Sequence, residues 1–379
     1  AGRPSMGGFG RRDEGGIMQI EAAVLRDPAG PLVIETLELA APGPHEVLVR
    51  IVGAGMCHTD VLPRVGYAPT PIVTGHEGSG VVEVVGSAVT SVAVGDHVVL
   101  SFDSCRECAN CLAGQPAYCA TFMPRNLSGR NLDGTTGATD ASGAEVATRW
   151  FGQSSFASHC LASDRNVVVV DKSLPLALMG PLGCGIQTGA GSILVAMKVQ
   201  PGTSLVVFGA GAVGLAAVMA GVVAGATTII AVDLQQHRLA LALELGATHT
   251  FHGNDADLLG EIQRVTGGGA QYSFDTTGVP AVMKTALACL RMTGVCGYVG
   301  VQLGDLVLDG SSLVGKTAIG ILEGSADPHV FIPRMIELWQ AGRFPFDRLI
   351  EQYPMSRINE AEASSLAGGT IKPVLIPGS

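Results

Sequence analysis

The glycine-rich stretch LVVFGAGAVG at Leu205–Gly214 is the feature that most restricts how this chain can fold. Gly209, Gly211 and Gly214 form a GxGxxG pattern after an apolar run that predicts a strand and before one that predicts a helix. The first glycine makes the tight turn, the second lets the backbone approach a pyrophosphate, and the third packs helix on strand. The helix N-terminus would then face the phosphate. The stretch therefore predicts a dinucleotide-binding βαβ unit.

A carboxylate after the next predicted strand indicates which dinucleotide is bound. Asp233 lies nineteen residues after Gly214. A carboxylate there can accept hydrogen bonds from both ribose hydroxyls and would repel a 2′-phosphate, which favours NAD. The alternative is that Asp233 only caps the following helix.

From about Thr203 the sequence alternates between short apolar runs and helical patterns, which predicts a doubly wound parallel α/β sheet of the Rossmann type. The predicted strands are Leu205–Phe208, Thr228–Val232, Thr248–Phe251, Tyr272–Phe274 and Gly294–Val299, and the predicted helices include Arg238–Leu245 and Ala281–Leu290.

The chain between about Gln19 and Val170 has a different pattern, with short β-runs broken by Gly and Pro. The clearest are Glu46–Val52, Gly80–Val85 and Val167–Val170, and a polar, glycine-rich surface loop is expected over Arg125–Glu145. We predict a β-rich domain here, in a chain whose 379 residues suit two domains of roughly 100–200 residues.

Composition excludes two classes of partner. A net charge of −10 argues against nucleic acid, which requires clustered Lys and Arg. Residues from Ser204 to Val232 carry no charge and could cross a bilayer by length, but glycines divide them into strand, helix and strand. Residues 1–17 lack the apolar core of a secretory signal, so we interpret them as a disordered extension or an expression remnant and expect a cytoplasmic protein.

Four of the nine cysteines are close together in the sequence. Cys105, Cys108, Cys111 and Cys119 have the spacing C-x2-C-x2-C-x7-C. A reducing compartment favours metal over disulfides, and four thiolates on one loop suit a structural zinc ion. An iron–sulfur cluster could use a similar spacing, whereas four free thiols would oxidise readily.

Three further candidate ligands lie far apart in the sequence. They are Cys57 in GMCHTD, His76 in GHEG and Cys184 in GCG. Two Cys and one His with an open fourth position form a catalytic zinc set. Taken singly, each could equally be an ordinary buried residue, and spacing alone cannot bring the three together.

Together these motifs resemble the zinc-dependent medium-chain alcohol dehydrogenases in order and spacing, from Met18 to the C-terminus. Three more stretches resemble the aryl-alcohol (benzyl-alcohol) branch of that family: Asn126–Thr136, Phe151–Ala157 and Phe331–Ile350. The resemblance implies a GroES-like catalytic domain over 18–184 and 322–379, with the Rossmann domain over 185–321.

The resemblance also implies roles around the metals. Cys57, His76 and Cys184 would bind catalytic zinc, and the four-cysteine loop a second zinc ion in each subunit. Asp60 and Glu77 would be the carboxylates that orient the ligands. Thr59 would hydrogen-bond the substrate oxygen.

At the cofactor, the resemblance places His58 and Lys372 at the pyrophosphate and Thr188 and Val213 against the nicotinamide. His58 and Lys372 stand where many family members have arginine, and Lys372 could instead be a solvated lysine near the C-terminus. Leu62 stands where many members have a histidine that ends a proton relay, which leaves the route of the proton to solvent open.

The expected activity is the NAD-linked interconversion of primary aromatic or allylic alcohols and aldehydes by a homodimer or homotetramer. Two alternatives stay open: a thiol-adduct (formaldehyde-type) dehydrogenase of the same superfamily, and a zinc- and NAD-binding protein without turnover. The second is disfavoured because a pure binder has no need of an open zinc position.

Overall fold

The computed structural model describes residues 17–302 and 304–378, so all of the predicted extension except Ile17 lies outside the described residues. Contacts divide the chain into two compact units. The first comprises the chain up to Cys108 together with Cys119–Gly183 and Ile350–Ser379, and the second comprises Ala109–Tyr118 and Cys184–Leu349. Each unit is described by itself.

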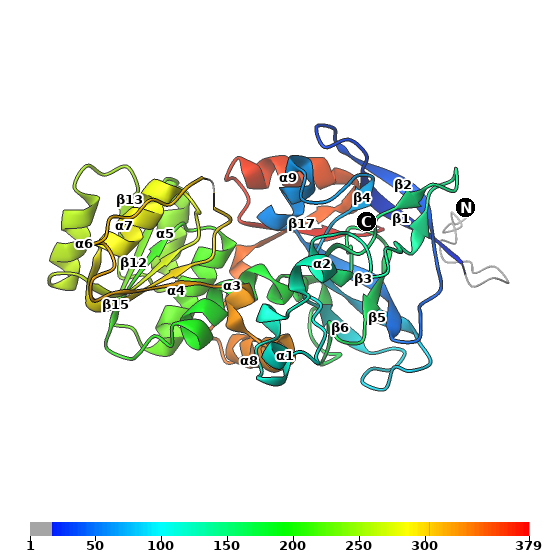
Figure 1. Cartoon of the computed structure of the whole chain (residues 1–379), viewed down its shortest axis with the longest axis horizontal. Coiled ribbons are helices and arrows are strands. Elements are labelled where there is room, and N and C mark those ends of the chain that lie inside the picture. The colour runs from blue at the N-terminus through cyan, green and yellow to red at the C-terminus, as the bar shows by residue number, and fades with distance from the viewer. Residues whose placement is uncertain (1–16, 303, 379) are drawn as a thin grey trace, which may run out of the picture. The chain divides into compact units, whose positions relative to one another are not determined.

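The first unit is built on two sheets (Figure 1). The five-stranded sheet has the order β4-β1-β2-β7-β8, with β1 (Met18–Leu25), β2 (Leu32–Leu39), β4 (Ile72–Val73), β7 (Ala138–Thr139) and β8 (Glu145–Val146). The seven-stranded sheet has the order β10-β6-β5-β3-β18-β17, with β9 beside β3; its strands are β3 (Glu46–Gly55), β5 (Glu77–Val85), β6 (His97–Leu100), β9 (His159–Ser163), β10 (Val167–Val170), β17 (Ile350–Pro354) and β18 (Lys372–Ile376).

Helices in the first unit are short. They are η1 (His58–Val65), α2 (Phe122–Asn126), η3 (Trp150–Gly152), η4 (Leu176–Leu178), η5 (Gly180–Gly183), η9 (Met355–Arg357) and α9 (Ile358–Leu366). The predicted loop over Arg125–Glu145 is interrupted by β7 and by the turn of α2.

The central strands of this unit are longer than their sequence patterns predict. Strand β3 continues to Gly55 rather than ending at Val52, because Gly53 lies against the backbone of Ala177 and Gly55 against the Glu77 side chain. A side chain at either position would collide with these groups. Glycine therefore marks close approach inside this strand rather than its end.

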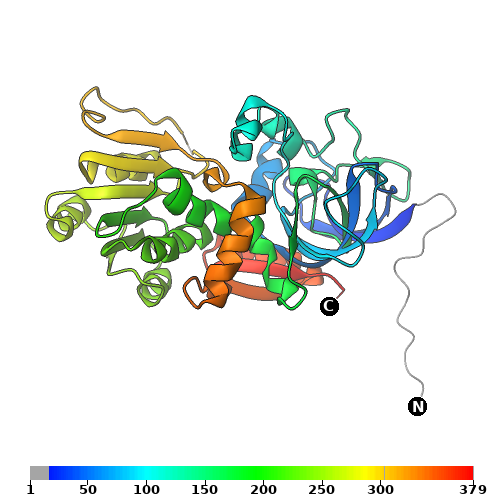
Figure 2. The same ribbon diagram turned by 90° about the horizontal axis from the view of Figure 1, so that it is seen from below.

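The second unit is a parallel six-stranded sheet with helices on both faces (Figures 1 and 2). Its order is β13-β12-β11-β14-β15-β16, with β11 (Ser204–Phe208), β12 (Thr228–Asp233), β13 (His249–His252), β14 (Ala270–Asp275), β15 (Leu290–Tyr298) and β16 (Thr317–Gly320). The helices are α1 (Ala109–Leu112), η2 (Pro116–Tyr118), α3 (Gly185–Gly191), η6 (Ser192–Ala196), α4 (Ala212–Ala224), α5 (Gln236–Glu244), α6 (Leu258–Thr266), α7 (Pro280–Ala288), η7 (Glu323–Ser325), α8 (Pro328–Gln340) and η8 (Phe346–Leu349).

The predicted strand–helix alternation is confirmed, and the strand order is that of a doubly wound dinucleotide-binding sheet. Strand β15 begins at Leu290, four residues before the predicted start at Gly294, because Leu290 is buried in the core beneath the sheet. Helix α7 correspondingly ends at Ala288.

The uncharged stretch from Ser204 to Val232 forms β11, α4 and most of β12, as predicted. Within the described part of the chain, every helix is too short or too polar to span a bilayer.

The compact units differ from the predicted domain limits over residues 322–349. These residues were assigned to the catalytic domain, but η7 and α8 pack on α3 and cluster with the second unit. Gly324 lies so close to Gly191 and the carbonyl of Gln187 that a side chain would not fit between them, which explains the tight association.

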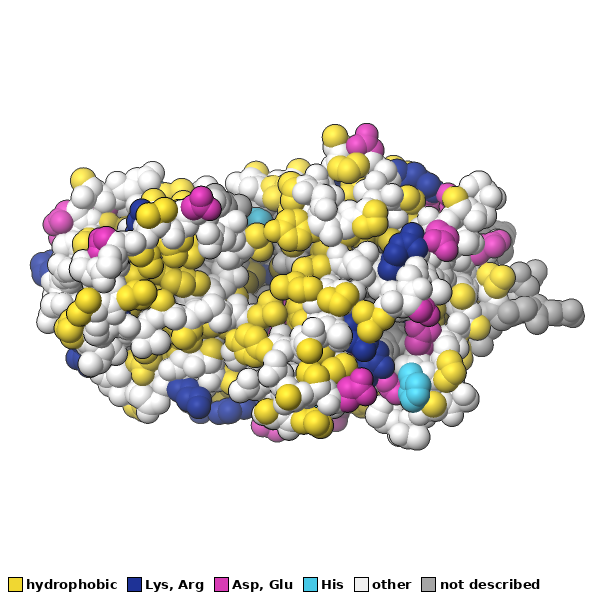
Figure 3. All heavy atoms as spheres, viewed as in Figure 1, with side chains coloured by type: hydrophobic (Ala, Val, Ile, Leu, Met, Phe, Trp, Pro, Cys, Tyr) yellow, Lys and Arg dark blue, Asp and Glu magenta, His cyan; other side chains and the backbone are white. Residues whose placement is uncertain are grey.

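On the face in Figure 3, Lys and Arg form small, separated groups among uncharged and apolar side chains.

Candidate active site and metal centres

The three separated zinc-ligand candidates lie together with Glu77. The ligand atoms of Cys57, His76, Glu77 and Cys184 are all within 4.8 Å of one another. His76, Glu77 and Cys184 are buried, and Cys57 is partly exposed. Two thiols and an imidazole suit tetrahedral zinc with one remaining position.

Cys57 is held at the junction between β3 and η1 by Asp60. The backbone N–H of Cys57 donates to Asp60 Oδ2 at 3.0 Å, in a reciprocal capping arrangement at the start of η1. Asp60 Oδ1 accepts from the N–H of Gly75 at 2.9 Å and lies 2.8 Å from His76 Nδ1. One carboxylate therefore positions both ligand-bearing loops.

Asp60 also fixes which nitrogen of His76 is available. An Nδ1–H that donates to the carboxylate leaves Nε2 as the metal ligand. Burial disfavours the imidazolium, but the adjacent Asp60 carboxylate holds the pKa of His76 well above its usual value. Zinc would compete with that proton.

Cys184 is placed by its neighbour Gly183, the last residue of that segment of the first unit. The Ser101 hydroxyl donates to the Gly183 carbonyl at 2.6 Å, and Gly183 packs so tightly on the Leu100 carbonyl that only glycine fits. Cys184 then begins α3. The first glycine of the GCG motif is therefore required by its close approach to the end of β6.

Glu77 is paired with Lys372. Both carboxylate oxygens of Glu77 lie 2.8 Å from Lys372 Nζ, which also donates to the Met56 carbonyl at 3.0 Å. Burial raises the pKa of Glu77 and the ammonium opposes this rise. Lys372 is 2% exposed, so the alternative of a solvated lysine is wrong. Strand β18 carries it there by pairing antiparallel with the end of β3.

The two residues after Cys57 have different environments. The Thr59 hydroxyl lies 3.8 Å from Cys57 Sγ, beside the ligand cluster, whereas His58 is exposed. Thr59 therefore adjoins the ligand cluster, and the His58 side chain faces solvent.

The four-cysteine group is formed as well. The sulfurs of Cys105, Cys108, Cys111 and Cys119 are within 4.8 Å of one another. Backbone N–H groups of Cys105, Cys108 and Ala120 donate to cysteine sulfurs at 3.2–3.5 Å. Although burial alone would raise it, the hydrogen bond from the Cys105 N–H and hydrogen bonds with Thr121 lower the pKa of Cys119, which favours the thiolate that zinc needs.

The GxGxxG turn lies between β11 and α4. Gly209 has φ +90° and packs on the Thr276 hydroxyl, and Gly214 packs on the Gly209 carbonyl without room for a side chain. The space over Gly211 is open, with Arg238 Nη1 its nearest group at 3.9 Å. This arrangement suits a pyrophosphate above Gly211.

Asp233 is the last residue of β12, and its side chain hydrogen-bonds to this turn. Its Oδ2 accepts from the N–H of Ala210 at 2.6 Å and its Oδ1 from the N–H of Gln235 at 2.8 Å. The capping position of α5 is Gln235, so Asp233 is not the residue that caps this helix. Its carboxylate remains close to the phosphate turn, where a ribose would lie.

Thr188 and Val213 lie on neighbouring helices of the second unit. Gly189 packs directly on the Val213 carbonyl, which brings α3 and α4 together. The Thr188 hydroxyl lies 3.5 Å from Glu323 Oε2.

Three residues at these sites were not anticipated from the sequence. Arg238 adjoins Gly211, and the only sequence signal is its position five residues after Asp233. Glu323, at φ +50°, lies 3.8 Å from Cys184 Sγ and had no signal. The ring of Phe151, at φ +52°, stacks on His76 with ring centroids 4.4 Å apart; Phe151 was in a family-like stretch, but its contact could not be inferred.

A β-rich unit, a Rossmann unit and two cysteine-containing clusters define a zinc-binding dehydrogenase of the two-domain type. Residues 43–172 match the model of the alcohol dehydrogenase GroES-like domain and residues 212–340 that of the zinc-binding dehydrogenase. The chain belongs to the zinc-dependent medium-chain alcohol dehydrogenase family, as predicted.

Three relatives illustrate its position in the family. Geraniol dehydrogenase of Castellaniella defragrans is 46% identical over 363 residues, 94% of this chain and 97% of that protein. The crystal structure of benzyl alcohol dehydrogenase from Acinetobacter calcoaceticus superposes with a TM-score of 0.91 at 43% identity, covering 95% and 99% of the two chains. A probable S-(hydroxymethyl)glutathione dehydrogenase of Schizosaccharomyces pombe is 34% identical over 360 residues, 92% and 94% of the chains.

Proposed function

We propose that this alcohol dehydrogenase interconverts primary aromatic or allylic alcohols with their aldehydes, using NAD and two zinc ions per subunit. The observation that carries the substrate class is a buried aromatic cluster of Phe102, Phe122, Trp150 and Phe151, in which the Phe151 ring stacks on His76. Conjugated substrates offer a flat apolar body that an aromatic surrounding of the metal ligands favours over a short aliphatic alcohol. The named activities of the geraniol and benzyl alcohol dehydrogenases point in the same direction.

The residues of the cluster fit the catalytic metal. Cys57, His76 and Cys184 would hold a zinc ion, which would supply a Lewis acid for the alcohol oxygen, and NAD would supply the hydride acceptor. Asp60 keeps His76 in the ligand tautomer. The Thr59 hydroxyl would hydrogen-bond the substrate oxygen and pass on its proton.

Lys372 neutralises Glu77 at the edge of this cluster, so the buried carboxylate does not add an uncompensated negative charge. The predicted contacts of Lys372 and His58 with the pyrophosphate, and of Thr188 and Val213 with the nicotinamide, belong to the proposal. Lys372 would have to serve Glu77 and the phosphate at once.

Cofactor choice rests on Asp233. Its carboxylate near the glycine turn would repel a 2′-phosphate and favour NAD over NADP. Asp233→Ala should narrow this preference by weakening the use of NAD⁺, measured as the ratio of kcat/KM for NAD⁺ and NADP⁺. Equal use of the two cofactors by the unaltered enzyme would contradict this role.

The proposal also includes the association of subunits of this enzyme with one another. Strand β16 is the edge of the six-stranded sheet, and the segment before it exposes Val301, Val307, Leu313 and Val314. An apolar edge of this kind is typical of a contact surface. We propose a homodimer or homotetramer, which sedimentation analysis would distinguish from a monomer.

The substrate assignment is tested by a panel of benzyl alcohol, an allylic terpene alcohol and ethanol with NAD⁺, followed by NADH absorbance. Higher kcat/KM for the first two is expected, and more efficient turnover of ethanol than of benzyl alcohol would overturn the assignment. One relative is a probable S-(hydroxymethyl)glutathione dehydrogenase, so the thiol-adduct alternative is tested by assaying formaldehyde with and without glutathione. Turnover that requires the thiol adduct would favour that alternative.

A further inference from the structure

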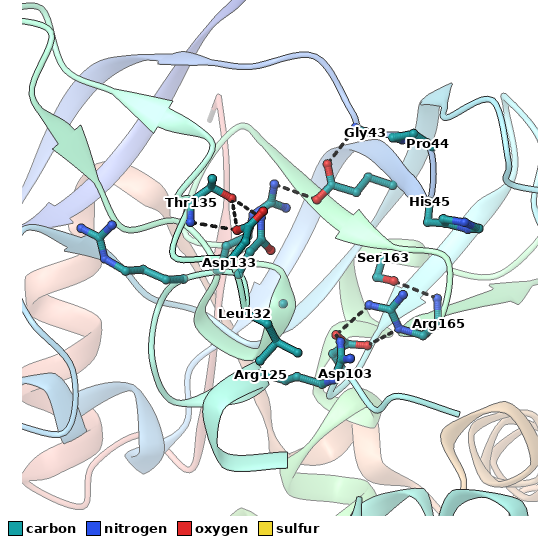
Figure 4. A pocket seen from close by; sticks show the side chains of 15 residues that line it. Gly43, Pro44, His45, Asp103, Arg125, Leu132, Asp133, Thr135, Ser163 and Arg165 are labelled. Atoms are coloured by element: carbon teal, nitrogen blue, oxygen red, sulfur yellow. Dashed lines mark hydrogen bonds and ion pairs between the residues drawn. The ribbon is translucent and has the colours of Figure 1, made fainter. Parts of the chain in front are cut away.

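A cavity in the first unit, with a volume of about 400 Å³, contains none of the zinc ligands in its lining. Its wall is formed by the segment before β3, the residues that flank the four-cysteine loop, and the end of β9 (Figure 4). This volume lies within the range of about 300–1,000 Å³ that small-molecule sites occupy.

Arginines are concentrated in this wall. Of the 18 arginines in a chain of net charge −10, four line the cavity: Arg125, Arg130, Arg149 and Arg165. They come from four separate positions along the chain, so the fold rather than a local basic run brings them together. Such convergence is a feature of sites that bind planar anions.

Asp103 serves two of these guanidinium groups. It lies 3.0 Å from Arg125 Nη1 and 3.0 Å from both Nε and Nη2 of Arg165, as Figure 4 shows. One carboxylate therefore compensates two cations. Arg125 donates its Nε to Thr121, and its Nη2 makes no hydrogen bond among residues 17–302 and 304–378.

Arg149 provides a second, independent observation. It is 4% exposed, with Nη2 2.9 Å from Glu46 Oε1 and Nη1 3.2 Å from the Leu161 carbonyl. Its Nε is buried and has no hydrogen-bond partner in the described part of the chain. A buried donor without an acceptor is unfavourable, so this guanidinium keeps hydrogen-bonding capacity that the described residues do not use.

The remaining charged side chains of the wall are engaged with neighbouring residues. Arg130 pairs with Glu145, and Asp133 accepts from the hydroxyl and N–H of Thr135. The lining thus contains four arginines and three carboxylates, Glu46, Asp103 and Asp133. Together with Glu145, the partner of Arg130, these carboxylates balance the four arginines, so hydrogen bonds from the guanidinium groups rather than a net positive charge would hold an anion. Leu132 adds an apolar surface.

We propose that this cavity is a binding site for a small oxyanion, a carboxylate or a phosphate group, held by Arg125, Arg149 and Arg165. The site is separate from the proposed alcohol chemistry and does not depend on it. Asp103 precedes the four-cysteine loop and Arg125 follows it, so the bound anion would tie together the two ends of that loop.

The test uses titration calorimetry on the zinc-loaded full chain with inorganic phosphate and, separately, benzoate, against chloride at equal ionic strength. We expect saturable binding of one anion per chain and a higher Tm at saturation. Binding of phosphate alone assigns a phosphate group, and binding of benzoate alone assigns a carboxylate. Absence of saturable binding of either would overturn the proposal.

Two variants connect the binding to this cavity. Arg125→Gln should weaken binding by about tenfold, since it removes one charge-assisted contact. Arg357→Gln is the matched control, because it removes an exposed arginine that pairs only locally with Glu360. The proposal would be contradicted if both variants weakened anion binding equally, or if neither variant weakened it.

Asp133→Asn should change the affinity for the anion in the opposite direction. It removes a negative charge from an exposed position of the wall, so binding should tighten severalfold, an outcome that a purely structural role of the wall does not produce. If Arg125→Gln does not fold, Asp133→Asn tests whether the anion binds in this cavity. Unchanged or weaker binding by Asp133→Asn would then overturn the proposal.

Discussion

The two cysteine-containing clusters of this enzyme are built in different ways. The four-cysteine group takes its ligands from fifteen consecutive residues, 105–119, and the sulfurs are held by neighbouring backbone N–H groups. The cluster of Cys57, His76, Glu77 and Cys184 draws on three distant segments and is held by side chains. Lys372 from the C-terminal strand joins it.

This difference indicates separate purposes. Four sulfurs close the coordination shell of zinc and leave no position for a substrate, so such a site stabilises its loop. The second cluster mixes sulfur, imidazole and a carboxylate already engaged by Lys372, so a zinc ion held by Cys57, His76 and Cys184 would keep one position for an alcohol oxygen. Loss of the first should reduce stability, and loss of the second should reduce turnover.

The largest expected effect is that of Cys184→Ala. Removal of one catalytic ligand should reduce alcohol turnover to background, while circular dichroism still reports a folded chain. Zinc content should fall from two ions to one. Retention of substantial turnover with two zinc ions would show that Cys184 is not a catalytic ligand.

Cys111→Ala should lower stability and leave turnover intact, the reverse of Cys184→Ala. We expect loss of the structural zinc and a decrease in Tm of roughly 10 °C or more, because several kcal/mol of metal binding is folding free energy. Turnover per folded molecule should be retained. If metal analysis finds iron and labile sulfide in the unaltered enzyme, the assignment of this cluster to zinc is wrong.

Lys372→Met tests the buried ion pair that distinguishes the second cluster. An unpaired Glu77 carboxylate should cost about 3–5 kcal/mol of unfolding free energy, measured by urea denaturation. Lys172→Met, at an exposed pair with Asp96, should cost at most about 1 kcal/mol. The double variant Lys372→Met/Glu77→Gln should recover part of the loss; a purely additive result would mean that the pair is not coupled.

Asp60→Asn probes the orientation of His76. Weaker polarisation of Nδ1–H should reduce the affinity for catalytic zinc by about 10–100-fold, measured by competition with a chelator. Asp164→Asn removes the carboxylate of an exposed Asp–His pair with His45 and should leave zinc affinity unchanged. Equal chelator sensitivity in the two variants would argue against the role of Asp60.

The smallest effect is expected for Leu62→His, which would restore a proton acceptor in η1. Since an imidazole is a better base than water near neutrality, the rising limb of the pH–rate profile should move toward neutral pH. A deuterium isotope effect on single-turnover oxidation first establishes that chemistry is observed. Val65→His, exposed on the same element, is the control; identical profiles for both variants would contradict the relay argument.

Local sequence patterns were sufficient for the features that depend on neighbouring residues. The GxGxxG turn, the alternation of strands and helices after Thr203 and the spacing of the four cysteines each reflect backbone geometry within one loop or one βαβ unit. The strand limits were less predictable, as in β3 and β15, because close packing of Gly53 and burial of Leu290 extend these strands.

The sequence by itself therefore determined the family, the fold class and the identity of the candidate ligands. Only the tertiary structure decided that Lys372 neutralises Glu77, that Phe151 stacks on His76 and that four arginines from residues 125–165 share one cavity. Such contacts arise from the pairing of β18 with β3 and from the folding of loops over the sheets. A one-dimensional pattern carries no information about side chains that meet across hundreds of residues, because their proximity is set by the packing of whole sheets.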